Sequence, residues 1–203
     1  MPALDARLES FHAAHTRPFG VSVDSAFSHA AWGESLGGIR FPLLSDFHPK
    51  GAVADSYGLY LADGGITDRA TVLIDAGGII RHISAVGPAN ARDMDELLKL
   101  CQDHDAGYEG HVDPVANPKG LDGKATLYVK EPCTFSRWAL CARANLKLGD
   151  DAITVKNVTN DPEAAAELER LGGKNQAPAL AMGKELLYES KDIIDLLAAR
   201  ACF

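Results

Sequence analysis

One segment of the chain constrains the fold more than any other, because it cannot form part of a compact core. Residues 105–123, DAGYEGHVDPVANPKGLDG, carry Gly and Pro at short intervals and show no hydrophobic periodicity, which is typical of a linker. We assign residues 105–122 to this linker, between a first part (1–104) and a second part (123–203). A chain of 203 residues is long enough for two small domains of this kind.

Both parts alternate segments of helical and strand-like periodicity, which predicts an α/β fold. In the first part we expect helices at 3–15, 28–36 and 90–100, a short helix at 51–58, and strands at 19–24, 41–46, 69–75 and 79–86. In the second part we expect the order β-α-β-α-β-β-α, over 125–130, 134–148, 152–158, 162–172, 178–183, 185–189 and 190–201. Ser190 is the expected N-cap of the last helix.

Charge and cysteine content exclude several classes of protein. A net charge of -8 argues against nucleic acid or an anionic membrane as a partner, since both require clustered Lys and Arg. The N-terminus lacks the pattern of a secretory signal, and no apolar run is long enough to span a membrane. The four cysteines, at 101, 133, 141 and 202, are too few for a disulfide scaffold. We therefore expect a reduced protein with a cytoplasmic location.

The chemistry is clearest in the segment KEPCTFSR, residues 130–137. A predicted strand runs into a Pro and then Cys133 at the first turn of a helix, where free backbone N–H groups and the helix dipole favour the thiolate. Lys130 adds positive charge nearby. Ser136 stands where a Cys-x-x-Cys pair would carry its second thiol, so Cys133 can attack a disulfide without a resolving cysteine in this motif. The plain alternative is a small buried cysteine at a helix start.

The second part resembles the glutaredoxins and the N-terminal domains of glutathione transferases over residues 123–200. The resemblance rests on LYVKEPCTFS, on GGKNQAPAL (172–180) and on YES (188–190). It implies a thioredoxin-like fold, a reaction with glutathione as the reducing co-substrate, and a cis peptide bond before Pro178 that faces Cys133. It also implies a glutathione site, with the main chain of Ala177 at the cysteine moiety, Ser136 beside the thiolate, Lys130 near a carboxylate, and Glu189 and Ser190 at the γ-glutamyl end.

Two departures from that family narrow the mechanism. Ser136 replaces the second cysteine of the dithiol glutaredoxins, so a dithiol mechanism is excluded, and Thr134 stands where iron–sulfur-binding monothiol glutaredoxins carry Gly.

Cys141 follows Cys133 by eight residues, about 12 Å along a helix. This exceeds the roughly 7 Å that a disulfide allows between Cα atoms, so Cys141 is not its partner.

The first part is similar to the peroxiredoxins of the alkyl hydroperoxide reductase and thiol-specific antioxidant group, from about residue 2 to 104. The resemblance rests on GVSVDS (20–25), His29 and Trp32, FPLLSD (41–46) and RATVLID (69–75). It implies that Arg69 stabilises the peroxidatic thiolate and the peroxide oxygens. A guanidinium suits this role because it is always charged and donates hydrogen bonds in a fork.

The peroxidatic motif of that family, a Pro and a Thr leading to a Cys, is absent from residues 1–104. By resemblance this cysteine and the strand before it would precede Pro2, so we expect a first domain without its N-terminal strand and peroxidatic loop. Cys101 lies on an apolar helical stripe and is expected in the core, with a resolving role as the alternative. A truncated product is favoured over a half-domain that serves as a docking surface, because a missing strand exposes a sheet edge.

The sequence thus predicts two thioredoxin-like domains, and a glutathione-dependent thiol-disulfide oxidoreductase acting in hydroperoxide detoxification and redox homeostasis. Its expected substrates are a mixed disulfide or a hydroperoxide, and a homodimer is expected. Peroxidase activity from this chain alone is doubtful. An alternative is a binding module without turnover, in which two Cys133 thiolates and two glutathiones hold an iron–sulfur cluster. We expect no other metal site, because no ligand spacing typical of one is present.

Overall fold

The computed structural model describes residues 1–202 and divides them into two compact units. The first unit comprises residues 1–29 and 41–116, and the second comprises residues 30–40 and 117–202. The segment 30–40 therefore groups with the second unit, although it precedes the linker in sequence. None of the helices in residues 1–202 is long and apolar enough to cross a membrane.

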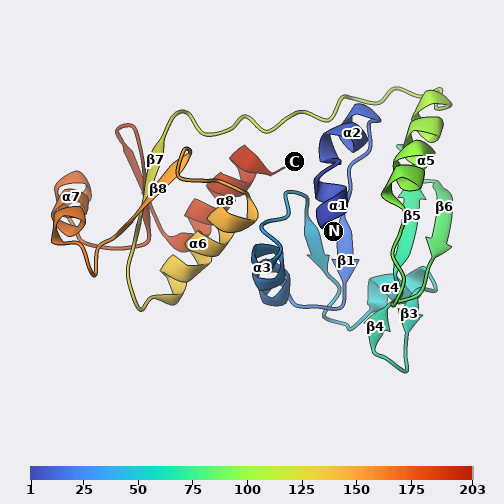
Figure 1. Cartoon of the computed structure of the whole chain (residues 1–203), viewed down its shortest axis with the longest axis horizontal. Coiled ribbons are helices and arrows are strands. Elements are labelled where there is room, and N and C mark those ends of the chain that lie inside the picture. Colours follow the sequence, from blue (N-terminus) through green and yellow to red (C-terminus); the bar gives the residue numbers. More distant parts are fainter. Residues whose placement is uncertain (203) are drawn as a thin grey trace. The chain divides into compact units, whose positions relative to one another are not determined.

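The second unit is built on one sheet of four strands in the order β10-β9-β7-β8 (Figure 1). The central strand β7 (Ala125–Val129) pairs parallel with β8 (Ile153–Asn157) and antiparallel with β9 (Ala179–Met182). β9 in turn pairs antiparallel with β10 (Glu185–Tyr188). With α6 (Thr134–Asn145), α7 (Pro162–Gly172) and α8 (Ser190–Ala201), the predicted order β-α-β-α-β-β-α is confirmed.

Helices cover both faces of this sheet, and the core lies in two layers on either side of β7. Leu127 packs with Ile193 and Leu197 of α8 in one layer, and Tyr128 packs with Leu168 of α7 in the other. All of these side chains are buried. Because the strand is covered on both faces, its sequence ATLYV shows no polar alternation. Each fully buried aliphatic side chain contributes about 1.5–3 kcal/mol to stability.

The ends of two helices in this unit show how local sequence sets their bounds. The Asp161 carboxylate accepts hydrogen bonds from the N–H groups of Glu163 and Ala164 and starts α7, which ends at Gly173 with φ 72°. The predicted N-cap of α8 is wrong. Ser190 is the first helical residue and is buried, while Glu189 takes the cap position with φ 67° and no side-chain cap bond. Because Glu189 takes this positive φ, the cap lies one residue earlier than expected and the helix begins at Ser190.

The strands of the first unit form three separate pairs. β1 (Gly20–Ser22) pairs parallel with β2 (Leu43–Ser45), and β5 (Ala70–Ile74) pairs antiparallel with β6 (Ile80–Ala85). A short hairpin, β3 (Tyr60–Leu61) with β4 (Ile66–Thr67), was not predicted from the sequence. No strand among residues 1–202 joins β1 to β5.

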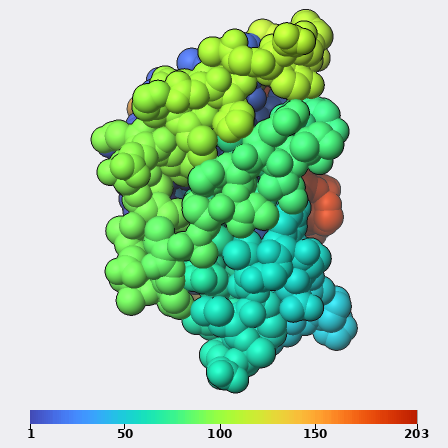
Figure 2. Space-filling view, turned by 90° about the vertical axis from the view of Figure 1, so that its right-hand side faces the viewer, coloured from blue at the N-terminus to red at the C-terminus, as the bar shows by residue number. Residues whose placement is uncertain are grey.

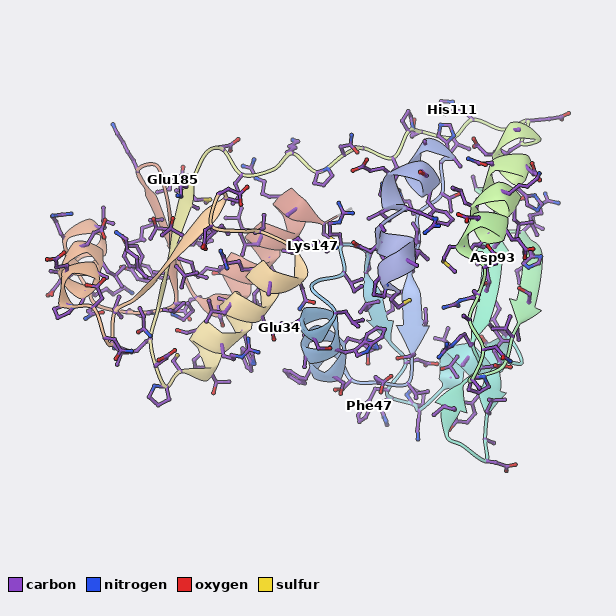
Figure 3. All side chains as sticks on the ribbon, in the orientation of Figure 1. Glu34, Phe47, Asp93, His111, Lys147 and Glu185 are labelled. Atoms are coloured by element: carbon purple, nitrogen blue, oxygen red, sulfur yellow. The ribbon has the colours of Figure 1, made fainter. Side chains whose placement is uncertain are left out.

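The helices of the first unit differ from the sequence prediction at their ends. The expected helix 3–15 is interrupted at Arg7, which separates α1 (Pro2–Asp5) from α2 (Leu8–Ala13). α5 (Met94–Ala106) begins four residues later than expected, because the Asp93 carboxylate caps it by accepting from two backbone N–H groups (Figure 3). It also runs into the predicted linker. The remaining helices are α3 (Ala26–Ser35) and α4 (Ala52–Ser56).

Candidate functional site

Cys133 lies in the turn between the central strand and the helix that follows it. β7 ends at Val129, and Cys133 is the N-cap of α6, with extended backbone angles of φ -150° and ψ 115°. Its Sγ accepts a hydrogen bond from the Ser136 N–H at 3.5 Å. The predicted start of the helix at residue 134 is confirmed, and Cys133 at this helix start is its cap. In that position its sulfur faces the N–H groups that have no partner inside the helix.

The surroundings of Cys133 favour the thiolate. Burial raises the pKa of the thiol, but hydrogen bonds from the backbone and side chain of Ser136, the Phe135 N–H and the positive charge of Lys130 lower it further than burial raises it. The net shift of the Cys133 pKa is therefore downward. Because the thiolate is the attacking species in disulfide exchange, this shift increases the reactive fraction at neutral pH.

Ser136 connects the strand end to the helix start. Its side chain is buried, and its hydroxyl oxygen accepts a hydrogen bond from the Lys130 N–H at 3.0 Å. A second bridge supports the same turn, since the Thr159 hydroxyl accepts from the Glu131 N–H and donates to the Glu131 carbonyl. The turn that presents Cys133 is thus held by one half-buried and two exposed hydrogen bonds.

Strand register brings the other candidate residues to the same edge of the sheet. Tyr128 of β7 and Tyr188 of β10 both pair with Ala179 of β9. The segment after β7, which leads to Cys133, therefore shares an edge with residues 177–178 before β9 and residues 189–190 after β10. The Ala177–Pro178 peptide bond is cis, as the resemblance implied.

Gln176 belongs to this edge and was missed by the sequence analysis. Its side-chain amide donates to the Glu189 carboxylate at 2.8 Å. The contact ties the segment before β9 to the residue after β10. Its place two residues before Pro178 in GGKNQAPAL was the available signal, but nothing in the sequence showed which way the side chain would point.

Arg69 lies in the first unit, just before β5. Its Nη1 donates to the Asn90 carbonyl at 2.8 Å, and the Nη1 of Arg92 donates to the Ala70 carbonyl at 2.5 Å. Burial, with the nearby charge of Arg69, lowers the pKa of Arg92. Two guanidinium groups thus approach each other at the start of β5 and bond to carbonyl oxygens.

The remaining cysteines do not share the environment of Cys133. Cys101 is 3% exposed and packs against Phe11 and Ala14, and burial raises the pKa of its thiol. Burial and then the Glu34 carboxylate raise the pKa of Cys141. Cys202 lies near the Arg40 carbonyl, at 3.2 Å. None of the four cysteines forms a disulfide within residues 1–202, and the core position expected for Cys101 is the one observed.

Comparison with known proteins assigns the two parts of the sequence to two families. Residues 1–83 match the AhpC/TSA family, and residues 127–201 match the glutathione S-transferase N-terminal domain. The chain therefore joins a peroxiredoxin-family segment to a glutaredoxin-like domain, and both resemblances are confirmed. The fold is accordingly α/β, with a thioredoxin-like second domain.

Several known proteins are similar to about half of this chain. Human peroxiredoxin-4 is 41% identical over 106 residues, which are 49% of this chain and 38% of that protein. The mitochondrial thioredoxin-dependent peroxide reductase of Drosophila melanogaster is 38% identical over 104 residues, 48% of this chain and 44% of that protein. The chain thus spans less than half the length of these relatives. Among solved structures, the reduced 2-Cys peroxiredoxin of Plasmodium vivax is 35% identical, covering 52% of this chain and 68% of that one, with a TM-score of 0.46.

Proposed function

We propose that the chain is a glutathione-dependent thiol-disulfide oxidoreductase and that Cys133 is its nucleophile. The single observation that carries the proposal is the position of Cys133 as the N-cap of α6, where its Sγ accepts from the Ser136 N–H. Together with the charge of Lys130, these hydrogen bonds lower the pKa of the thiol. Among Cys101, Cys133 and Cys141, this is the one thiol whose surroundings favour the charged form.

The proposed reaction is a monothiol exchange in two steps. The Cys133 thiolate attacks the glutathione sulfur of a mixed disulfide, the old S–S bond breaks, and the substrate leaves as a thiolate that takes a proton from water. Cys133 then carries glutathione as a mixed disulfide. The thiolate of a second glutathione attacks that glutathione sulfur, releases glutathione disulfide and restores the Cys133 thiolate. Ser136 has no sulfur, so no intramolecular disulfide with that position competes.

Glutathione is proposed to bind along the sheet edge that presents Cys133. The backbone of Ala177, before the cis peptide bond, is available to the cysteine moiety of glutathione. The exposed Lys130 would attract a carboxylate of glutathione, while Glu189 and Ser190 would meet the γ-glutamyl ammonium and carboxylate ends. In this arrangement Gln176 orients the Glu189 carboxylate through the bond at 2.8 Å.

The first part of the chain suggests the substrate class. We infer that the mixed disulfide arises from a peroxidatic thiol of a peroxiredoxin after it has reduced a hydroperoxide, with Arg69 stabilising charge in that step. Fusion to such a unit, or assembly with it in a homodimer, would raise the local concentration of the substrate toward about the millimolar range. The proposed role is therefore hydroperoxide detoxification and redox homeostasis, with the cytoplasm as the expected compartment.

A turnover assay with matched cysteine variants tests the proposal. The purified chain is supplied with a glutathionylated peptide, glutathione, glutathione reductase and NADPH, and NADPH consumption is followed. We expect Cys133→Ser to abolish the activity and Cys141→Ser to retain it, because Cys141 lies in the same helix with a raised pKa. Equal losses in both variants would overturn the monothiol assignment.

A further inference from the structure

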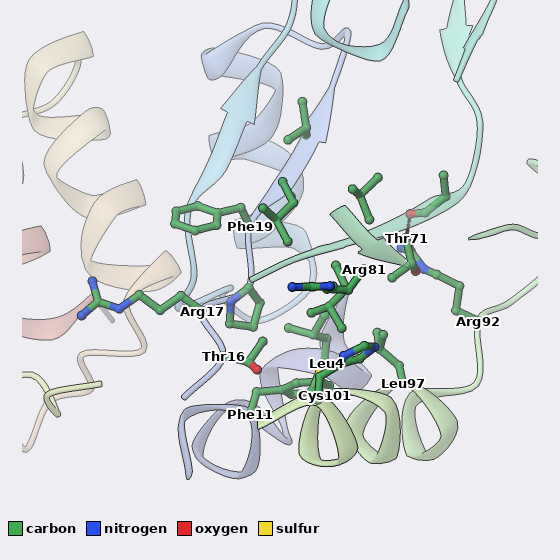
Figure 4. Close-up of a pocket in the computed structure, with 18 of the residues that line it drawn as sticks. Leu4, Phe11, Thr16, Arg17, Phe19, Thr71, Arg81, Arg92, Leu97 and Cys101 are labelled. Atoms are coloured by element: carbon green, nitrogen blue, oxygen red, sulfur yellow. Dashed lines mark hydrogen bonds between the residues drawn. The ribbon is translucent and has the colours of Figure 1, made fainter. Parts of the chain in front are cut away.

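A cavity of about 1390 Å³ in the first unit belongs to the surroundings of Arg69, and residues of β1 and β5 line it. In Figure 4, Phe11 and Leu97 lie together on one side of it, and Phe19 lies across from them. Figure 2 shows the green segments of this unit with gaps between them, through which blue N-terminal residues are visible. This cavity adds nothing to the role proposed for Arg69, whereas the loop after β8 in the second unit makes contacts that bear on Cys133.

The loop after β8 runs beside the turn that presents Cys133. β7 and β8 pair in parallel up to Val129 and Asn157, and the Val158 N–H then donates to the Val129 carbonyl at 2.9 Å. Val158 is buried, so this last backbone bond between the two segments is shielded from water. Beyond it β7 has ended, and residues 130–133 form the turn that leads into α6.

The Thr159 side chain continues the contact where the strands have ended. Its hydroxyl accepts from the Glu131 N–H at 2.8 Å and donates to the Glu131 carbonyl at 3.1 Å. A hydroxyl has one donor and two acceptor lone pairs, so it serves both backbone groups of Glu131 at once. Within a sheet these two bonds would come from the backbone of a neighbouring strand. Thr159 therefore replaces a strand partner at a position where the backbone has left the sheet.

The loop that carries Thr159 is itself held at both ends. The Asn157 side-chain carbonyl accepts from the Thr159 N–H at 3.0 Å, and the Asn157 backbone carbonyl accepts from the N–H groups of Asn160 and Asp161. The Asp161 carboxylate then caps α7, whose first turn includes the buried Ala164. The hydroxyl thus projects from a loop that is fixed to β8 on one side and to α7 on the other.

Two neighbouring residues of the turn are anchored from different elements. The Lys130 N–H donates to the hydroxyl of the buried Ser136, in the helix after the turn, at 3.0 Å. Glu131 is bonded to Thr159, in the loop after β8. The next residue is a proline, whose ring fixes φ at about −65°. Few backbone angles between these anchors and Cys133 are free to change, so the direction of the Cys133 sulfur depends on both anchors.

We propose that Thr159 is a positioning residue for the exchange reaction: by fixing Glu131, it aims the Cys133 sulfur at the N–H groups that start α6 and at the disulfide to be attacked. The proposal rests on the assignment of Cys133 as the nucleophile. Thr159 acts through the backbone of the turn and takes no part in the exchange itself. Small misplacements of a reacting group cost a large factor in rate, so the loss of one anchor is expected to slow the chemical step.

Variants of the full chain separate positioning from plain stability. Thr159→Val and Thr159→Ala remove both bonds to Glu131, Thr159→Ser keeps the hydroxyl, and Thr154→Val, at the far end of β8 from the turn, is the matched control. The rate of Cys133 alkylation by iodoacetamide is measured against pH, with Cys133→Ser as the background, and this readout needs no glutathione. Turnover of a glutathionylated peptide gives kcat and KM, and urea unfolding gives the stability.

We expect Thr159→Val and Thr159→Ala to lower kcat about tenfold while KM changes less than about twofold. They should also raise the pKa of Cys133, because its thiolate meets the N–H groups of α6 less well. Water can serve the backbone of Glu131, which is exposed, so unfolding should change little. Thr159→Ser should restore both kcat and the pKa, and Thr154→Val should leave both as in wild type.

A loss of stability in Thr159→Val without a change in kcat or in the pKa of Cys133 would overturn the proposal, because Thr159 would then support only the fold. A loss of kcat that Thr159→Ser does not restore would overturn it as well. The proposed function has a separate outcome. If wild type shows no glutathione turnover, but Thr159→Val raises the pKa of Cys133 and Thr159→Ser returns it, the glutathione-dependent function fails and the positioning role of Thr159 is supported.

Discussion

The backbone N–H of Ser136 points at the Sγ of Cys133 across 3.5 Å, while the Ser136 hydroxyl accepts from the Lys130 N–H at 3.0 Å. One buried serine therefore holds the turn in shape and supplies hydrogen bonds to the thiolate. These two roles explain why a cysteine at this helix cap has a lowered pKa although burial alone would raise it.

Ser136→Ala is expected to raise the pKa of Cys133 and to lower stability. The variant keeps the backbone N–H but loses the hydroxyl, so part of the stabilisation of the thiolate remains. The Lys130 N–H loses its acceptor, at a cost of about 1–3 kcal/mol in the free energy of unfolding. The pH dependence of iodoacetamide alkylation, corrected with Cys133→Ser, gives the pKa, and urea unfolding gives the stability. Ser190→Ala, another buried serine, is the control, and equal pKa values for Ser136→Ala and wild type would contradict the account.

Lys130→Gln is expected to raise the pKa of Cys133 by removing a positive charge. Because Lys130 is exposed, the effect should shrink as salt is added, since screening acts over about 10 Å at 0.1 M ionic strength. Lys124→Gln, at the opposite end of β7, is the matched control and should leave the pKa unchanged. A pKa shift that persists undiminished in high salt would argue that Lys130 acts through the shape of the turn instead.

The stability of the second unit should depend on pH through Cys133. Because folding lowers the pKa of this thiol, the folded state binds the proton less tightly than the unfolded chain does. The Cys133 thiolate therefore makes its full contribution to the free energy of unfolding above the pKa of the unfolded chain, about 8.5. This contribution is lost as pH falls through the lower pKa of the folded state. Wild type should gain stability relative to Cys133→Ser as pH rises through this window. If the difference in the free energy of unfolding between wild type and Cys133→Ser stays constant between these two pKa values, folding does not lower the pKa of Cys133.

Cys101 should react far more slowly than Cys133 in the native protein. It is buried, and burial raises the pKa of its thiol. At neutral pH we expect alkylation of Cys101 at least about tenfold slower than that of Cys133, with the two rates becoming similar in denaturant. Mass spectrometry of digested peptides separates the two sites. Rapid alkylation of Cys101 in the native protein would contradict this expectation and would show that Cys101 is a reactive thiol.

The central strand β7 should be the most protected segment against hydrogen exchange. Its residues pair with β8 and β9 on both sides and are nearly all buried. Among residues 1–202, by contrast, β1 pairs with β2 alone and β5 pairs with β6 alone. Exchange of the β7 amides is expected to require global opening of the second unit, and the amides of Val21 and Val72 are expected to exchange by local opening. Equal hydrogen-exchange protection of the β7 amides and of the Val21 and Val72 amides in monomeric protein would contradict this, because β1 and β5 would then have no unpaired edge.

The elements that could be predicted from the sequence are those whose signals are local. Pro162 at the start and a glycine at the end of PEAAAELERLG indicated the bounds of α7, and the run ATLYVK indicated a strand. The helix start at Cys133 followed from the order of strand, Pro and Cys. Each of these depends on a few neighbouring residues, so no knowledge of the tertiary fold was needed.

Features that depend on backbone angles or distant contacts could not be predicted in this way. The φ of 67° at Glu189, which moves the cap of α8, is rare for a non-glycine residue and has no sequence signature. The two-residue strands of the hairpin β3–β4 are too short to show a period. The bond between Gln176 and Glu189 joins segments 13 residues apart and is visible only once β9 and β10 are paired.

Direct detection of the covalent intermediate tests the central claim, that Cys133 exchanges glutathione as a single thiol. The reduced chain is mixed with a glutathionylated peptide, quenched with acid within the first turnover, and digested for mass spectrometry. We expect one glutathione per chain, attached to the peptide that contains Cys133, with Cys101 and Cys141 still reduced. Glutathione on Cys141 or Cys101 instead, or a disulfide between Cys133 and another cysteine of the chain, would contradict it.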